Sequence, residues 1–145
     1  MKVYAQQIRA GAVMPKYMTL GAAGADLFAC LDEPVTIAPL TAHPVPTGIA
    51  LSIPEGYFGL ICARSGIAIH SGLAPANKVG VIDCDFRGEI TVYLYNHSAE
   101  TRTVHQGQRI AQIVFLPFLR AAFVAAPSLP ETARRRNGFG STGEY

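Results

Sequence analysis

The chain has 145 residues, of which half are hydrophobic and 15% are charged. This length fits one domain, and this composition excludes extensive disorder, because enough apolar surface is present to build a core. The formal net charge of +2 is too small to imply nucleic-acid binding by itself, so we expect no nucleic-acid partner. Fourteen glycines and ten prolines favour short strands and turns over a helical bundle.

We therefore expect an all-β fold, a jelly-roll-like single domain. The expected strands are Lys2–Ile8, Ala25–Cys30, Pro46–Ile53, Tyr57–Ala63, Gly88–Tyr95 and Arg109–Phe118. The fifth of these alternates, with Ile90, Val92 and Leu94 on one face, which is typical of a half-buried strand. One short helix is expected from Ser65 to about His70. Because proline cannot donate to a ladder, three prolines should lie at strand edges or ends: Pro44, Pro46 and Pro117.

The composition divides the chain into an expected core, residues 1–126, and an expected C-terminal arm, residues 127–145. No apolar run reaches the roughly 18 residues needed to cross a bilayer, and the Met-Lys start lacks a secretory signal. The chain has three cysteines, an odd number, with no CxxC spacing. We therefore expect neither a disulfide framework nor a zinc site, no membrane partner, and a location in the reducing cytoplasm.

Two segments have the composition of phosphate sites. Arg64–Gly66 combines a cation, a hydroxyl and a glycine amide before the expected helix, although a capping role explains Ser65 equally well. The arm places the run Arg134–Arg136 just before Gly138–Gly143, where glycine amides and hydroxyls could surround an anion. The alternative for this second segment is a frayed terminus, which leaves Phe139 without a packing partner.

The segment Gly80–Gly88 has the signals of a hairpin, since turn-forming residues lie between apolar runs. Asp83 follows two apolar residues, so we expect it to point into a partly enclosed place where it could accept a proton from water. The alternative is an Asx-turn, which we prefer for Asp85 and leave open for Asp83. Gln112 could reach a phosphate or satisfy neighbouring backbone. The four histidines have no ligand-like spacing, so a metal would be a hard cation held chiefly by phosphate oxygens.

Five segments, in order along the chain, resemble the five motifs of the trimeric dUTPases (deoxyuridine triphosphate nucleotidohydrolases). They are Ala23–Leu27, Arg64–Gly66, Gly80–Gly88, Gly107–Gln112 and Gly138–Gly143. The resemblance spans nearly the whole chain, and five ordered matches are far more specific than one. It implies a jelly-roll homotrimer that hydrolyses dUTP to dUMP and pyrophosphate with magnesium (Mg2+). It also implies active sites shared between subunits, each covered by a C-terminal arm.

The resemblance further implies a role for individual residues. Asp83 matches the carboxylate that activates the attacking water, and Asp26 matches an aspartate that helps to hold the metal's water shell. Phe86 stands where the family usually has tyrosine, whose ring packs on deoxyribose and leaves no room for a 2′-hydroxyl. Arg109 is expected to be scaffold. The other implied substrate contacts are Asn77, Gly80, Val81, Ile82 and Thr91 at the base or sugar, Phe139 stacking over uracil, and Arg64, Ser65, Gly66, Gln112, Arg134, Gly140, Ser141 and Thr142 at the phosphates. Because Arg135, Arg136 and Asn137 replace a usually glycine-rich stretch, the phosphate-contacting arginine of the arm stays open.

Two other functions compete with this interpretation. A dCTP deaminase has a related fold, but the position of its catalytic glutamate is occupied here by Tyr93. The chain could also be a non-catalytic nucleotide-binding module. The presence of Asp83, Arg64, Gln112 and Phe139 argues against that alternative.

Overall fold

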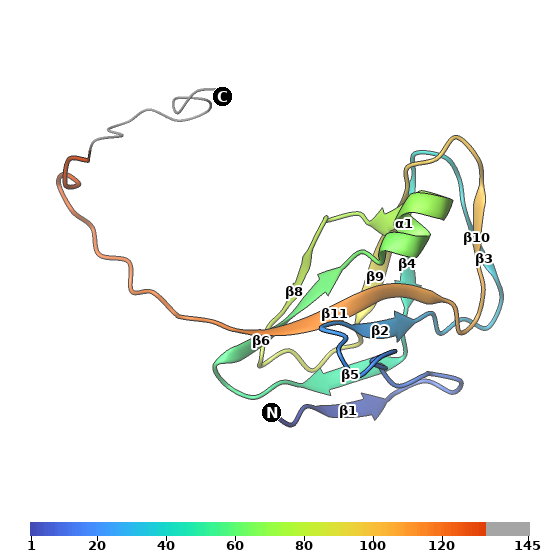
Figure 1. Cartoon of the computed structure of the whole chain (residues 1–145), viewed down its shortest axis with the longest axis horizontal. Coiled ribbons are helices and arrows are strands. Elements are labelled where there is room, and N and C mark those ends of the chain that lie inside the picture. The colour runs from blue at the N-terminus through green and yellow to red at the C-terminus, as the bar shows by residue number, and fades with distance from the viewer. Residues whose placement is uncertain (133–145) are drawn as a thin grey trace.

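The computed structural model describes residues 1–132 of the chain. Within them, eleven short strands and one helix form a jelly-roll-like, nearly all-β domain (Figure 1). The elements are β1 (Tyr4–Gln7), β2 (Ala25–Phe28), β3 (Val35–Ile37), β4 (Ala42–Pro46), β5 (Ile49–Ser52), β6 (Tyr57–Cys62), α1 (Ser65–Ser71), β7 (Leu73–Pro75), β8 (Gly80–Ile82), β9 (Thr91–Asn96), β10 (Arg102–Val104) and β11 (Arg109–Pro117). The all-β expectation is confirmed. No helix in this part of the chain is both long and apolar enough to span a bilayer.

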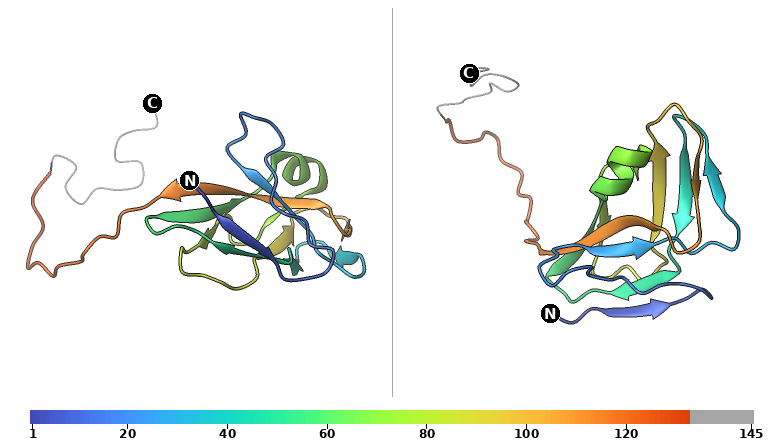
Figure 2. Two further views of the ribbon diagram at one scale, coloured as in Figure 1. Left: turned by 90° about the horizontal axis from the view of Figure 1, so that it is seen from below. Right: turned by 45° about the vertical axis from the view of Figure 1, so that its right-hand side comes forward.

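Two larger sheets carry the functional residues. One has four antiparallel strands in the order β2-β11-β6-β8, and the other has three in the order β4-β9-β7. The strand pairs β1-β5 and β3-β10 complete the fold, with β1 lying along β5 at one side of the domain (Figure 2). The long β11 is central to the first sheet, since it pairs with both β2 and β6.

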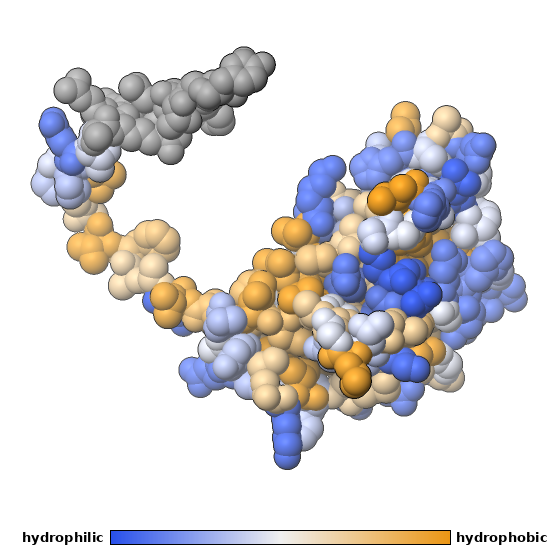
Figure 3. All heavy atoms as spheres, viewed as in Figure 1, coloured by the Kyte–Doolittle hydropathy of each residue, from blue (hydrophilic) through white to orange (hydrophobic). Residues whose placement is uncertain are grey.

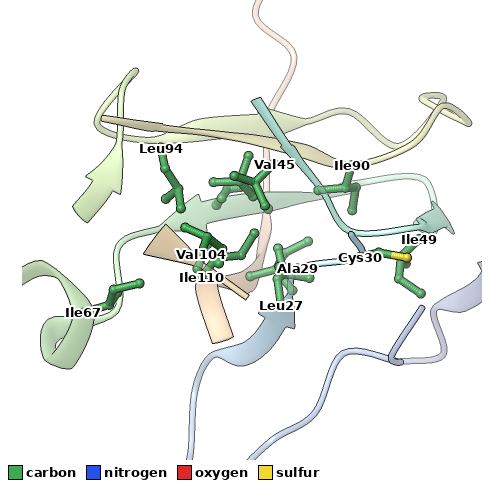
Figure 4. Packing of buried hydrophobic residues seen from close by; sticks show 14 of the residues in the cluster. Leu27, Ala29, Cys30, Val45, Ile49, Ile67, Ile90, Leu94, Val104 and Ile110 are labelled. Atoms are coloured by element: carbon green, nitrogen blue, oxygen red, sulfur yellow. The ribbon is translucent and has the colours of Figure 1, made fainter. Parts of the chain in front are cut away.

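The alternating pattern of β9 is confirmed. Ile90, Val92 and Leu94 are buried, whereas Tyr93 on the opposite face is 56% exposed. The buried face joins a single core cluster to which strands from every sheet contribute (Figure 4). Fully burying an Ile or Leu side chain contributes about 1.5–3 kcal/mol, so this cluster is the main stabilising element of the domain.

The proline prediction is also confirmed. Pro44 and Pro46 lie on β4, which is an edge strand of its three-stranded sheet, and Pro117 is the last residue of β11. Five strands were not among those expected: β3, β4, β7, β8 and β10, although β8 lies in the segment for which a hairpin was expected. Four of these have only three residues, too few to display a two-residue period, and β4 is interrupted by its prolines.

The predicted hairpin over Gly80–Gly88 is wrong. β8 pairs with β6, whereas β9 pairs with β4 and β7, so the two strands belong to different sheets. The segment between them, residues 83–90, is therefore a connection that crosses from one sheet to the other. Turn-forming residues predicted a change of direction correctly, but they carry no information about the partner of each strand.

Beyond Pro117 the chain leaves the domain as an extended segment (Figure 1). Its side chains make little contact with the domain, since Leu119 is 99% and Phe123 is 100% exposed. Apolar side chains gather on the visible face of the domain where this segment departs (Figure 3).

Candidate active site

A cationic pocket of about 230 Å³ opens beside β2, β11 and the start of α1. It contains four of the predicted phosphate contacts and the predicted metal-linked aspartate. Its lining residues are Met18, Ala22, Gly24, Asp26, Arg64, Ser65, Gly66, Arg109 and Gln112. The structure thus brings together parts of three separate sequence motifs.

The ladder of the four-stranded sheet places these side chains. Asp26 on β2 pairs with Gln112 on β11, and Gln112 pairs with Cys62 on β6, so the three side chains share one face. The amide nitrogen of Gln112 donates a hydrogen bond of 2.9 Å to the carbonyl of Ala63. This bond orients the Gln112 side chain over the end of β6. Gln112 thus satisfies neighbouring backbone and can still contact a phosphate. Its second N–H makes no hydrogen bond within the described residues.

Asp26 is the electrostatic centre of the cationic pocket. It is buried, and its two oxygens accept from Nε of Arg64 at 2.8 Å and from Nη1 of Arg109 at 3.2 Å. A second guanidinium nitrogen of Arg64 donates to the carbonyl of Arg109 at 3.3 Å. The pairing of Arg109 with Asp26 is compatible with the expected scaffold role. It also lines the pocket, which the sequence analysis did not foresee.

The donor set does not favour a metal bound by protein alone. Residues 1–132 contain no group of three His, Cys, Asp or Glu side chains arranged to hold an ion. Both oxygens of Asp26 already face guanidinium groups, and the pocket's other charged groups are cationic. A divalent cation would fit here only together with phosphate oxygens, with Asp26 using its remaining lone pairs through water.

The helix start disproves the capping interpretation of Ser65. The N-cap of α1 is Arg64 in an extended conformation, and no side chain caps the helix. Ser65 is the first helical residue and is exposed, so its hydroxyl is available to a ligand. The Ser65 and Gly66 amides belong to the first turn, where backbone N–H groups lack intrahelical partners.

A second pocket of about 140 Å³, the β8–β9 pocket, lies between those two strands. It contains five of the residues predicted at the base or sugar, whereas Phe86, predicted to pack on the deoxyribose, does not line it. The lining residues are Ile61, Pro75, Asn77, Gly80, Val81, Ile82, Thr91, Val92 and Tyr93. Sequence reasoning did not assign Tyr93 to this site, because on β9 it reads only as an outward-facing strand residue.

The turn between β7 and β8 positions Asn77. The next residue, Lys78, adopts a left-handed conformation with φ of 66°, which is rare and strained for a residue with a side chain. This turn folds the Asn77 amide over β8, where its nitrogen lies 3.2 Å from the position that a Cβ on Gly80 would take. The Asn77 side chain and the β8 backbone thus line the same small pocket.

Asp83 directly follows β8 and is exposed, so the expectation of a partly enclosed carboxylate is wrong for the isolated chain. Neither Asp83 nor Asp85 makes a side-chain hydrogen bond within the described residues, so the Asx-turn alternative receives no support. The backbone turns instead through a bond from the Phe86 N–H to the Asp83 carbonyl. The Phe86 ring folds over Gly88, where a Cβ would come within 2.7 Å of it.

The two pockets share no lining residue, and their walls include side chains on opposite faces of the four-stranded sheet. Gly80 pairs with Ile61 on β6, whereas Gln112 pairs with the next residue, Cys62. Successive side chains on a strand point to opposite faces, so Ile61 and Gln112 face different sides. Val81, which also lines the β8–β9 pocket, pairs with Leu60 and therefore faces the same side as Gln112. The β8–β9 pocket thus lies at the β8 edge of the sheet.

Five predicted substrate contacts lie outside the described residues. They are Arg134, Phe139, Gly140, Ser141 and Thr142.

Comparisons with known proteins agree on one family. A family model described as dUTPase matches residues 10–143. The deoxyuridine 5'-triphosphate nucleotidohydrolase of Hydrogenobaculum sp. is 46% identical over 143 residues, covering 99% of each chain. The enzyme of that name from Desulfitobacterium hafniense is 50% identical over 131 residues, covering 90% of this chain and 87% of that one. A solved structure of the Staphylococcus bacteriophage 80alpha dUTPase with dUPNHPP superposes with a TM-score of 0.88 at 25% identity, covering 98% of both chains.

Proposed function

The chain belongs to the dUTPase family, and from this premise we propose that it hydrolyses dUTP to dUMP and pyrophosphate. The observation that supports the proposal is a pair of pockets, one lined by five residues expected at the base or sugar and the other by four expected at the phosphates. A nucleoside triphosphate needs both: a small slot for the base, and cations and amide donors for several negative charges.

The β8–β9 pocket would hold uracil and the deoxyribose. Asn77 can donate and accept through its amide, and the β8 backbone offers N–H and C=O groups in a row, so together they can pair with the edge of a base. Phe86 would pack on the sugar and exclude a 2′-hydroxyl by its ring face, for which the missing phenol oxygen of tyrosine is not needed.

The cationic pocket would hold the phosphates. Arg64 and Arg109 supply positive charge, and Ser65, Gly66 and Gln112 supply neutral donors. Asp26 would then act first by orienting the two guanidinium groups. Charge that develops on the leaving pyrophosphate is stabilised most by donors that are already in place, because no reorganisation is then required during the reaction.

Asp83 would be the catalytic base. Its carboxylate accepts a proton from the attacking water while the water oxygen bonds to the α-phosphorus. The bond from the α-phosphorus to the oxygen that bridges to the β-phosphorus breaks, and pyrophosphate leaves with that electron pair. A positioned base of this kind contributes about 10²–10⁴-fold to the rate.

Mg2+ is the proposed cofactor, held chiefly by the substrate's phosphate oxygens. Asp26 would contact its water shell through lone pairs not used by the arginines. The ion would supply charge neutralisation on the polyphosphate.

We also propose that the active protein is a homotrimer with shared sites. Because the two pockets share no lining residue, a complete site would combine the β8–β9 pocket of one copy with the cationic pocket of another. A neighbouring copy would also cover Asp83, which a single chain leaves exposed. The proposal also divides the chain into a core, residues 1–126, and a covering arm, residues 127–145. The arm carries Arg134 and Phe139. The three free cysteines are consistent with a cytoplasmic location.

Product analysis after incubation with dUTP and Mg2+ tests the proposal. Formation of dUMP and pyrophosphate is expected, and Asp83→Ala should bind dUTP but lose nearly all turnover. Asp85→Ala is the matched control, since Asp85 is an exposed carboxylate two residues away on the same connection. Release of ammonia from dCTP would instead favour the deaminase alternative, and turnover retained by Asp83→Ala would remove Asp83 from its role.

A further inference from the structure

The connection that carries Asp83 and Phe86 is weakly held along its length. Its internal bonds are the turn at Phe86 and two bonds from the Arg87 guanidinium to the carbonyls of Cys84 and Phe86, and all are at the surface. No ladder joins β8 to β9. Apart from the partly buried Cys84, which packs against the core, the position of the connection therefore depends on how its two ends are attached.

Glu89 attaches the downstream end. One oxygen of its carboxylate accepts from Nε of Arg9 at 2.8 Å and from the backbone N–H of Gly48 at 2.8 Å. The carboxylate is mostly shielded, with 18% of the side chain exposed, whereas Arg9 is half exposed. The hydrogen bond and charge of Glu89 raise the pKa of the Arg9 guanidinium, so Arg9 stays positively charged. We call these three residues the Glu89 clamp.

The turn at Gly48 gives the clamp a rigid base. Gly48 has φ of 68°, and a Cβ there would lie 2.6 Å from Ala12 and 3.0 Å from the sulfur of Cys30. On the other side of the turn, the Thr47 hydroxyl donates to the Ile90 carbonyl at 2.7 Å. Cys30 and Ile49 pack beside one another at this end of the core (Figure 4). The clamp thus ties the downstream end of the connection to a turn that packs closely against Ala12 and Cys30.

We propose that Glu89 is a positioning residue for dUTP hydrolysis: through the Glu89 clamp it sets the placement of Asp83 and Phe86. This rests on the proposed function. Glu89 touches no expected substrate group, and it acts through the seven-residue segment, 83–89, that ends at it. A merely structural Glu89 would stabilise the fold and leave turnover per folded molecule unchanged. A positioning Glu89 changes turnover itself, because a shift of about 1 Å at a reacting group can cost on the order of 100-fold in rate.

The test compares kcat for dUTP with the affinity for a non-hydrolysable imido analogue of dUTP, in folded fractions of matched oligomeric state. Glu89→Ala is expected to lower kcat by about 10–100-fold, with a much smaller change in analogue affinity, because the cationic pocket is intact. Glu89→Gln is expected to recover most of kcat, since its amide oxygen still accepts from Gly48 and Arg9. Glu100→Ala is the control, because Glu100 is also paired with an arginine, Arg102 at 3.1 Å, but lies elsewhere on the surface.

Wild-type kcat in folded Glu89→Ala, or equal losses in the Ala and Gln variants, would overturn the proposal. If Glu89→Ala does not fold, Arg9→Ala replaces it as the test, because it removes the bond from Arg9 and keeps the bond from Gly48. A lowered kcat at unchanged analogue affinity would then support the proposal. An unchanged kcat would overturn it. A wild-type protein that does not hydrolyse dUTP would instead refute the proposed function, so the two failures are distinct.

Discussion

The carboxylate of Asp26 lies 2.8 Å from Nε of Arg64, although the two residues are 38 positions apart in the chain. The pair forms because β2 and the end of β6 flank β11 in the same sheet. Arg109, on β11 itself, approaches the other oxygen of the same carboxylate. One buried acid therefore sets two cations at the rim of the cationic pocket.

Asp26→Asn should weaken both the fold and catalysis. Loss of the charged bond to Arg64 is expected to lower the free energy of unfolding by about 1–3 kcal/mol. The Arg109 bond adds little, because that side chain is 42% exposed. Urea unfolding and dUTP turnover measure the two effects. Asp32→Asn is the control, since Asp32 is an exposed aspartate outside both pockets. Equal stability of the Asp26 and Asp32 variants would contradict the role assigned to Asp26.

Phe86 should determine discrimination against UTP. Removing the ring in Phe86→Ala is expected to lower the ratio of kcat/KM for dUTP over UTP by about 10–100-fold. Phe86→Tyr should keep the ratio, because the ring face is retained. Parallel steady-state assays with both nucleotides measure it. An unchanged ratio in Phe86→Ala would show that another group excludes the 2′-hydroxyl.

Cys30 should resist alkylation in the folded protein. Burial raises the pKa of the Cys30 thiol, an effect larger than the opposing influence of Arg9. At pH 8, iodoacetamide should therefore modify Cys62 and Cys84, which are less buried, well before Cys30. Peptide mass spectrometry before and after unfolding in urea measures the order. Early modification of Cys30 would show that this end of the core opens readily.

The same thiol makes stability fall at high pH. Because the folded pKa is raised, the unfolded chain loses this proton first as the pH increases. The contribution of Cys30 to the free energy of unfolding is fully present below the ordinary thiol pKa. It is lost as the pH rises through the pKa of Cys30 in the folded protein. In Cys30→Ala this part of the pH dependence should be absent, and its persistence there would assign it to another group.

The sequence predicted the features that local pattern determines. The alternation of Ile90, Val92 and Leu94 identified β9, and the apolar run before Arg64 identified the end of β6. The grouping of Asn77 with Thr91, and of Arg64 with Gln112, followed from the family resemblance, and the structure places each pair in one pocket.

The features that the sequence did not predict depend on contacts between distant parts of the chain. The bond from Gly48 to Glu89 spans 41 positions, and the pair of Asp26 with Arg109 spans 83. No local pattern specifies such partners. The hairpin error at Asp83 has the same cause, since turn residues predict a reversal but not which sheet receives the next strand. The expectation that Asp83 is enclosed rested on the two apolar residues before it, and such a local pattern does not determine how exposed the next side chain is.

The central claim is that one site combines the Asp83 connection of one copy with the cationic pocket of another. Mixing two inactive variants, Asp83→Ala and Arg64→Ala, by joint refolding tests this directly. A shared site predicts recovery of about a quarter of wild-type activity after equal random mixing, because each mixed trimer then contains one site with both parts intact. Each variant refolded alone should stay inactive. If the mixture is as inactive as its components, although tagged copies show that mixed oligomers formed, both parts must come from one chain and the account is contradicted.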